Sequence, residues 1–250
     1  MRRTVVNPLW ITLGVAAIFL AGLTNGVSGF GFALVAVPLL ILYLPPKVVV
    51  PLVTIHSAIT GSVVLYEARK WLQLQKTWPL LLAGTLGVPP GSYLLTHLDV
   101  RTFKVYGGVT ITLAALAFLF GFRRPIRNER QAYGPVGLLG GLLNGSTGMG
   151  GPPVILFLTN QGMEKRIFRA SLAAYFLSMN LIALPTYAWE GLLTRTVAIY
   201  AALYLPALAL GLALGIRLAR VVEEQAFRRL TLLVVLAAGL ISMAQGFGLL

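Results

Sequence analysis

The sequence predicts an all-α polytopic membrane protein built from two inverted-topology repeats, each a broken or re-entrant helical hairpin followed by three transmembrane helices. Hydrophobic residues make up 57% of the 250-residue chain and charged residues 11%, a composition too apolar for a soluble domain of this size. The apolar residues gather in ten segments, and a glycine-rich motif recurs 119 residues after its first occurrence. These observations predict eight to ten membrane segments in two related halves.

Each half holds five of the apolar segments. They are 9–24, 30–44, 48–66, 78–95 and 103–122 in the first repeat (residues 1–122), and 132–143, 149–160, 168–189, 196–216 and 227–250 in the second (residues 132–250). A charged cytoplasmic linker, residues 123–131, joins them. Each half makes an odd number of crossings whether its hairpin spans or re-enters, so the halves are expected to have opposite orientations. Inverted repeats with broken helices that meet near the midplane are typical of secondary transporters.

The recurring motif opens each half. It reads NGVSGFG at 25–31 and NGSTGMGG at 144–151. The apolar runs around the second copy, 132–143 and 149–160, would each be about 18 Å long as helices, too short for a hydrocarbon core of about 30 Å. We therefore expect a hairpin that enters the membrane, breaks at the glycines and returns. Non-helical backbone at that depth must line a cavity or be buried in protein, so the two breaks are the expected binding site.

The chemistry expected at the breaks is anion binding. All seven acidic residues lie in loops or at segment ends, and the absence of carboxylates inside the membrane disfavours a cation carrier. Helix N-termini and free backbone N–H groups that face the centre would favour an anion. The alternative, that the glycines only permit close helix packing, remains open.

Polar side chains near the breaks supply further candidate ligands. The asparagines could cap the restarting helices or donate to a ligand, and the hydroxyls could donate to an oxyanion or bond their own helix backbone. A histidine and an asparagine inside later segments could contact an anion or be ordinary buried groups that bond neighbouring helices. The predicted substrate-binding residues are Asn25, Ser28, Gly29, Gly31, His56, Asn144, Ser146, Thr147, Gly148, Gly150, Gly151 and Asn180.

A second class of function, an intramembrane hydrolase, is the alternative. The sequence GVSG at 26–29 resembles the G-x-S-G motif of rhomboid intramembrane serine proteases, with Ser28 as nucleophile and His56 as base. The second repeat places Thr147 and Tyr175 at the equivalent positions. A duplicated break with one such pair is better explained by symmetric backbone architecture, so a hydrolase is the alternative and not the expectation.

Charge indicates how the chain lies in the membrane. Fourteen Lys and Arg residues fall in loops that parity places on one side and six on the other. This bias predicts extracytoplasmic termini and, with a net charge of +13, gives no reason to expect nucleic acid. The chain has no Cys and no P-loop, so we expect no metal, redox cofactor or ATPase part. The expected partners are a small anion and the bilayer, and the oligomeric state, monomer or homodimer, is left open.

The motifs resemble those of the TauE/SafE family of sulfite and organosulfonate exporters. The resemblance rests on N-G-x-S-G-x-G in the first half, N-G-x-x-G-x-G-G-P in the second, and a G-x3-G segment late in each half. It implies a multi-pass inner-membrane permease that exports sulfur-containing anions, with no enzymatic activity. The matching site positions are Asn25, Ser28, Gly29, Gly31, Asn144, Thr147, Gly148, Gly150 and Gly151. The first half departs from the pattern at 32–33, where Phe-Ala replaces Gly-Pro, so the site is expected to be asymmetric.

Overall fold

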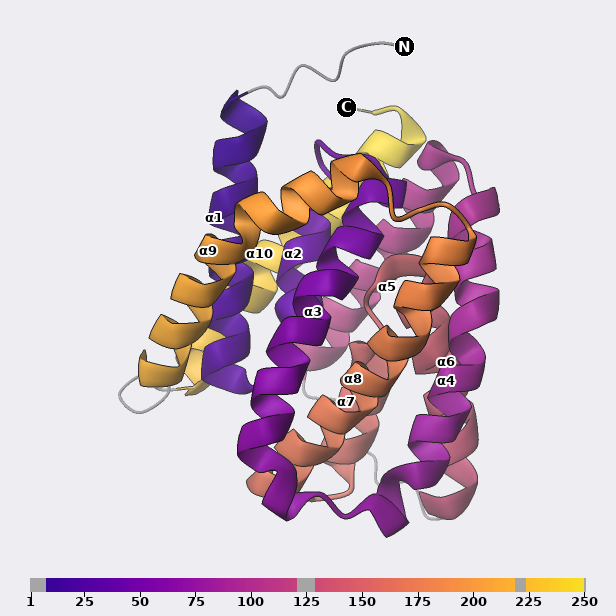
Figure 1. The fold of residues 1–250 in the computed structure, drawn as a ribbon, viewed down its shortest axis with the longest axis vertical. Coiled ribbons are helices and arrows are strands. Elements are labelled where there is room, and N and C mark those ends of the chain that lie inside the picture. The colour runs from indigo at the N-terminus through magenta and orange to yellow at the C-terminus, as the bar shows by residue number, and fades with distance from the viewer. Residues whose placement is uncertain (1–7, 121–128, 219–223, 250) are drawn as a thin grey trace.

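The computed structural model describes residues 8–120, 129–218 and 224–249. This part of the chain contains α-helices and no strands, which confirms the predicted all-α polytopic membrane fold (Figure 1). Within the described residues, five helices, α1, α3, α5, α8 and α9, are long and apolar enough to cross a membrane. The helices are α1 (Pro8–Ser28), α2 (Phe32–Leu40), α3 (Pro46–Ala68), α4 (Leu74–His97), α5 (Val100–Leu119), α6 (Glu129–Thr147), α7 (Gly151–Asn160), α8 (Lys165–Trp189), α9 (Arg195–Leu218) and α10 (Glu224–Phe247).

The five helices α1–α5 correspond in order to α6–α10. In each set a long helix is followed by a short one, α2 with 9 residues and α7 with 10. The principal packing contacts correspond too, because α1 packs along α9 while α6 packs along α4, and α5 meets α10 while α3 meets α8. The first helix of each hairpin is therefore held mainly by a helix of the other half.

Connections that occupy corresponding places in the two sets of helices lie at opposite ends of the molecule. The α3–α4 connection, which contains the short 3-10 helix η1 (Arg69–Trp71), is at the lower end of Figure 1, and the α8–α9 connection is at the upper end. The start of α1 and the end of α10 both lie at the upper end (Figure 1). At the lower end, Arg166 lies 4.7 Å from the ring centroid of Trp71. This contact places the α7–α8 and α3–α4 connections on one side, as loop parity predicted.

The lengths of the hairpin helices correct the sequence-based expectation. α1 has 21 residues and α6 has 19, which makes them about 31 and about 28 Å long, so only α2 and α7 are short. α6 begins at Glu129, inside the expected linker, and the rest of that linker up to residue 128 lies outside the described residues. Hydropathy alone missed the terminal turns of α1 and α6, because polar residues at the end of a helix can still be helical.

Many of the glycines serve close packing between helices. A Cβ at Gly141 would collide with the carbonyl oxygen of Gly84, and a Cβ at Gly215 would collide with that of Leu23. These contacts join α6 to α4 and α9 to α1. The alternative that glycines permit close helix approach therefore holds for this set and for Gly150 of the second break, where a Cβ would collide with the carbonyl oxygen of Gly140.

Candidate functional site

The first break, residues 29–31, separates α1 from α2. Helix α1 continues through Ser28, and the N–H of Gly29 still donates to the carbonyl of Asn25 at 2.7 Å. The chain then turns through positive φ angles of 80° at Gly29 and 95° at Gly31, a region that glycine enters without steric cost. Helix α2 starts immediately afterwards at Phe32, so its N-terminus lies at the turn.

The second break, residues 148–150, separates α6 from α7. Gly148 repeats the first arrangement, because its N–H donates to the carbonyl of Asn144 at 2.9 Å and its φ is 73°. Helix α7 then begins at Gly151 and continues through Pro152 and Pro153. These prolines carry no N–H, so the start of α7 offers fewer backbone donors than the start of α2.

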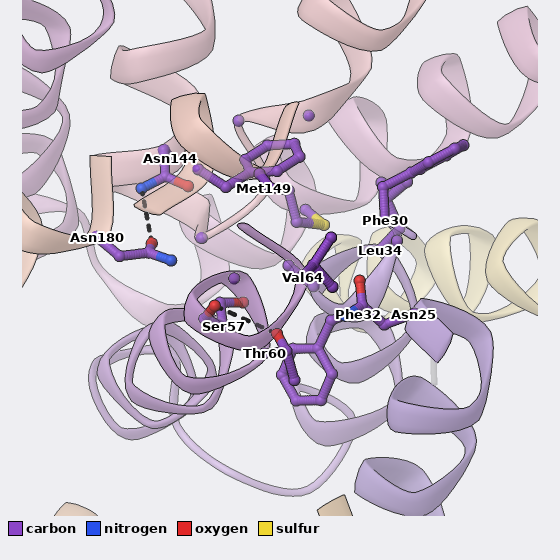
Figure 2. A pocket seen from close by; sticks show the side chains of 18 of the residues that line it. Asn25, Phe30, Phe32, Leu34, Ser57, Thr60, Val64, Asn144, Met149 and Asn180 are labelled. Carbon is purple, nitrogen blue, oxygen red and sulfur yellow. Dashed lines mark hydrogen bonds between the residues drawn. The ribbon is translucent and has the colours of Figure 1, made fainter. Parts of the chain in front are cut away.

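Both breaks line one cavity of about 50 Å³. Its remaining wall comes from the middle of α3 and α8, and Figure 2 shows Asn25 and Phe32 on one side with Asn144 and Asn180 on the other. None of the described residues that line it is charged. Eight of the twelve predicted site residues line it: Asn25, Gly29, Gly31, Asn144, Gly148, Gly150, Gly151 and Asn180.

Two buried amide groups in this wall lack hydrogen-bond partners. The Nδ2 atoms of Asn25 and Asn180 have none within the described part of the chain, although these residues are only 5% and 2% exposed. Asn144 lies beside Asn180, and its Nδ2 donates to Oδ1 of Asn180 at 3.5 Å (Figure 2). Because a buried donor without a partner is costly, the two free amides indicate a place for a hydrogen-bond acceptor.

The helix starts add backbone donors and positive potential. The first residues of α2 and α7 line the cavity, and the first N–H groups of a helix have no partner within it. Each helix N-terminus also carries roughly half an elementary positive charge. Two such ends and two free amides, with no carboxylate in the lining, suit a small anion.

The three predicted hydroxyl ligands lie off the cavity. The Oγ of Ser28 lies 2.8 Å from the carbonyl oxygen of Thr24. Ser146 and Thr147 donate to carbonyls of the preceding turn of α6, at 2.8 and 2.7 Å. These bonds are the local side-chain to backbone alternative that the sequence left open. Thr147 Oγ1 also accepts from the N–H of Met149 at 3.2 Å, so it supports the turn of the second break.

His56 also lies away from the cavity. It is fully buried, with Nδ1 2.9 Å from the carbonyl oxygen of Leu52 and Nε2 3.2 Å from that of Ala201. Its ring therefore links α3 to α9 and is not directed at Ser28, whose Oγ faces backbone carbonyls. The nucleophile and base of the hydrolase alternative are not paired in this structure.

Sequence reasoning missed several residues of the wall. Ser57 and Thr60 in α3 line the cavity, with Thr60 Oγ1 donating to the carbonyl of Ser57 at 3.2 Å (Figure 2). Phe30, Phe32 and Phe176 supply aromatic surface. The spacing of Ser57 and Thr60 on one helix face was the available signal, but nothing local in the sequence says which helix meets the breaks.

Comparison with known proteins identifies the family of this chain. The chain matches the profile of the family described as "Sulfite exporter TauE/SafE" over residues 14–241. A curated protein of Cupriavidus necator, "Probable sulfite/organosulfonate exporter TauE", is 27% identical over 236 residues, which cover 87% of this chain and 86% of that protein. No solved structure matches. The resemblance found in the motifs is thus confirmed, and the protein is a transporter and not an enzyme. The chain belongs to the sulfite exporter TauE/SafE family.

Proposed function

We propose that this protein exports a small sulfur oxyanion, sulfite or an organosulfonate, which binds in the cavity between the two breaks. The observation that carries the proposal is the donor set. The free Nδ2 groups of Asn25 and Asn180 and the N-termini of α2 and α7 face one cavity whose described lining holds no carboxylate. The name of the Cupriavidus relative supports the choice of sulfur anions.

The size of the cavity favours a compact anion. A water molecule needs about 10–15 Å³ of such space, so the cavity of about 50 Å³ has room for about four waters. That is the bulk of sulfite or of the sulfo group of a sulfonate. The organic part of a larger sulfonate would require the walls to move apart.

The binding groups also suit release. The lining holds neutral donors and partial helix charges and, among its described residues, no Lys or Arg. An anion held by partial charges is bound more loosely than one paired with a buried guanidinium, and a transporter must let its substrate go.

Alternating access by two inverted repeats completes the proposal. Equivalent connections lie at opposite ends of the molecule (Figure 1), and the principal packing contacts recur between halves. We place the protein in the inner membrane with both termini outside the cytoplasm, because the connections richer in Lys and Arg then face the cytoplasm. Rocking of one repeat against the other would expose the cavity to each side in turn.

Flux into proteoliposomes tests the proposal. Purified protein should move radiolabelled sulfite or sulfoacetate above the rate of empty liposomes. The double variant Asn25→Ala/Asn180→Ala should lose at least nine-tenths of that flux. Ser62→Ala, which removes a hydroxyl exposed on α3, is the matched control and should keep it. No flux of any sulfur anion, with peptide cleavage that Ser28→Ala removes, would instead establish the hydrolase.

A further inference from the structure

A cationic side chain lies against the first break. A Cβ placed on Gly29 would stand 3.0 Å from Nε of Arg169 and 3.1 Å from its Cδ, so the Arg169 side chain, which comes from α8, covers Gly29. Next to it, the rings of Phe168 and Phe30 meet edge to face with centroids 5.9 Å apart. Because Gly29 and Phe30 line the cavity, Arg169 stands at its edge.

Among the described residues, the carboxylate of Glu67 pairs with Arg169 at the same edge. Nη2 of Arg169 lies 3.5 Å from Oε2 of Glu67, at the end of α3, and the two side chains are 27% and 47% exposed. Ion pairs with that much solvent contact contribute little to stability. The guanidinium can therefore exchange Glu67 for another anion at small cost, and its planar donors match the oxygens of an oxyanion.

The second break has an apolar cover at the equivalent place. Residue 50 precedes Arg169 by 119 positions, as Gly29 precedes Gly148, and it is Val. A Cβ on Gly148 would lie 3.6 Å from Val37 and 3.7 Å from Val50, and both valines are fully buried. One break is thus covered by a partly solvated cation and the other by a sealed apolar contact.

We propose that Arg169 is the anion-capturing residue at this mouth of the cavity, and that Glu67 is the internal carboxylate that an arriving anion displaces. The inference rests on the proposed function and adds a residue to it. Capture by a charge at the edge, followed by transfer to the neutral donors inside, explains how a cavity without lysine or arginine among its described lining residues attracts its substrate. The Val50 side has no such group in the described structure and suits release.

Equilibrium binding of radiolabelled sulfite to the purified protein in detergent tests the pair. Arg169→Gln should weaken binding at least tenfold, and Arg169→Lys should recover part of the loss. Glu67→Gln should tighten binding several-fold, because the competitor of the substrate is gone. Arg166→Gln is the matched control. It removes the same charge three residues earlier on α8, where the guanidinium faces Trp71, and binding should change less than twofold.

The opposite signs make the test decisive. If the ion pair only braces α8 against α3, Arg169→Gln and Glu67→Gln will shift binding in the same direction, and the inference is wrong. Equal effects of Arg169→Gln and Arg166→Gln would also overturn it, by showing a general loss of surface charge. If the wild-type protein binds neither sulfite nor sulfoacetate, the proposed function fails with it. If the wild-type protein binds sulfite and the Arg169 and Glu67 variants bind it with the same affinity, only the Arg169 inference is overturned.

Discussion

The two breaks share the backbone turn at their first glycine, but φ at the equivalent third glycine is 95° at Gly31 and −69° at Gly150, and the surrounding side chains differ as well. In each, an Asn near the end of the long helix accepts from a glycine with positive φ through its own carbonyl. In the second break Asn144 is paired with Asn180, whereas position 61, the expected equivalent of 180 in the first half, is Gly, and Nδ2 of Asn25 has no partner among the described residues. Two similar hairpins can therefore hold two different donor sets.

The starts of the short helices α2 and α7 differ in the number of backbone N–H donors that they offer. Helix α2 begins with Phe32 and Ala33, which both carry backbone N–H groups, while α7 has prolines at its second and third positions. The first break thus contributes more backbone donors, and the second contributes a linked pair of side-chain amides. We expect an anion to bind asymmetrically.

The largest expected effect is in topology. The absence of Cys allows single cysteines at two exposed equivalent positions, Lys70→Cys in η1 and Thr194→Cys before α9. In intact cells and inverted vesicles, a membrane-impermeant maleimide should label them from opposite sides, with residue 70 accessible only from the cytoplasm. Labelling of both from one side would end the proposal that the halves are inverted.

Alanine at equivalent glycines should separate steric from conformational roles. A Cβ on Gly150 would collide with the carbonyl oxygen of Gly140 and come within 2.7 Å of Asn144 Cβ, whereas one on Gly31 meets its nearest atom at 3.5 Å. Gly150→Ala should therefore abolish transport and destabilise the protein by about 1–3 kcal/mol. Gly31→Ala, strained only by its positive φ, should cost about 1–2 kcal/mol and keep part of the flux.

Thermal unfolding in detergent and sulfite flux measure this pair. Both variants should still insert and purify as folded protein. The comparison is wrong if Gly31→Ala loses all transport while Gly150→Ala is active, because the free space and the backbone angle would then rank the two positions in the wrong order.

The two motif asparagines should differ in stability more than in binding. Asn25→Ala removes an amide with no partner in the described structure, so binding should weaken by about 1–3 kcal/mol with an unchanged unfolding temperature. Asn144→Ala should weaken binding by about the same amount. It should also lower stability by about 0.5–1.5 kcal/mol, because the bond to Asn180 is lost. Equal unfolding temperatures for the two variants would contradict the paired and unpaired assignment.

The sequence predicted the parts of this site that follow from local pattern. The ten apolar segments correspond to the ten α-helices of the described residues, and three of the six positive φ angles among those residues, at Gly29, Gly31 and Gly148, fall inside the recurring motif. Asn25, Asn144 and Asn180 do line one cavity. Internal repetition carried this information, because a motif that recurs in register marks backbone geometry that both halves need.

What the sequence could not give depends on contacts between distant segments and on rotamers. Ser28 and Thr147 stand beside the breaks, but their hydroxyls bond carbonyls one turn earlier, and a pattern cannot choose between that and a ligand. His56 is fixed by Ala201 of α9. Arg169 was counted only as a loop cation, because its place over Gly29 requires α8 of one half to cross the break of the other.

The smallest expected effect on sulfite binding tests whether a larger substrate uses the space that the missing side chain at residue 61 leaves. A Cβ on Gly61 would meet its nearest atom, in Leu177, at 3.9 Å, an ordinary contact, and alanine within a helix is more stable than glycine by about 0.5–1 kcal/mol. Gly61→Ala should therefore raise the unfolding temperature slightly. Because Gly61 lines the cavity, the added methyl group should change sulfite binding by no more than about twofold. It should weaken the binding of sulfoacetate by about 1–3 kcal/mol, because the larger anion would be overpacked against it. Equal losses for both anions would mean that the small oxyanion itself occupies the space beside Gly61, and that Asn144 and Asn180 are not its main contacts.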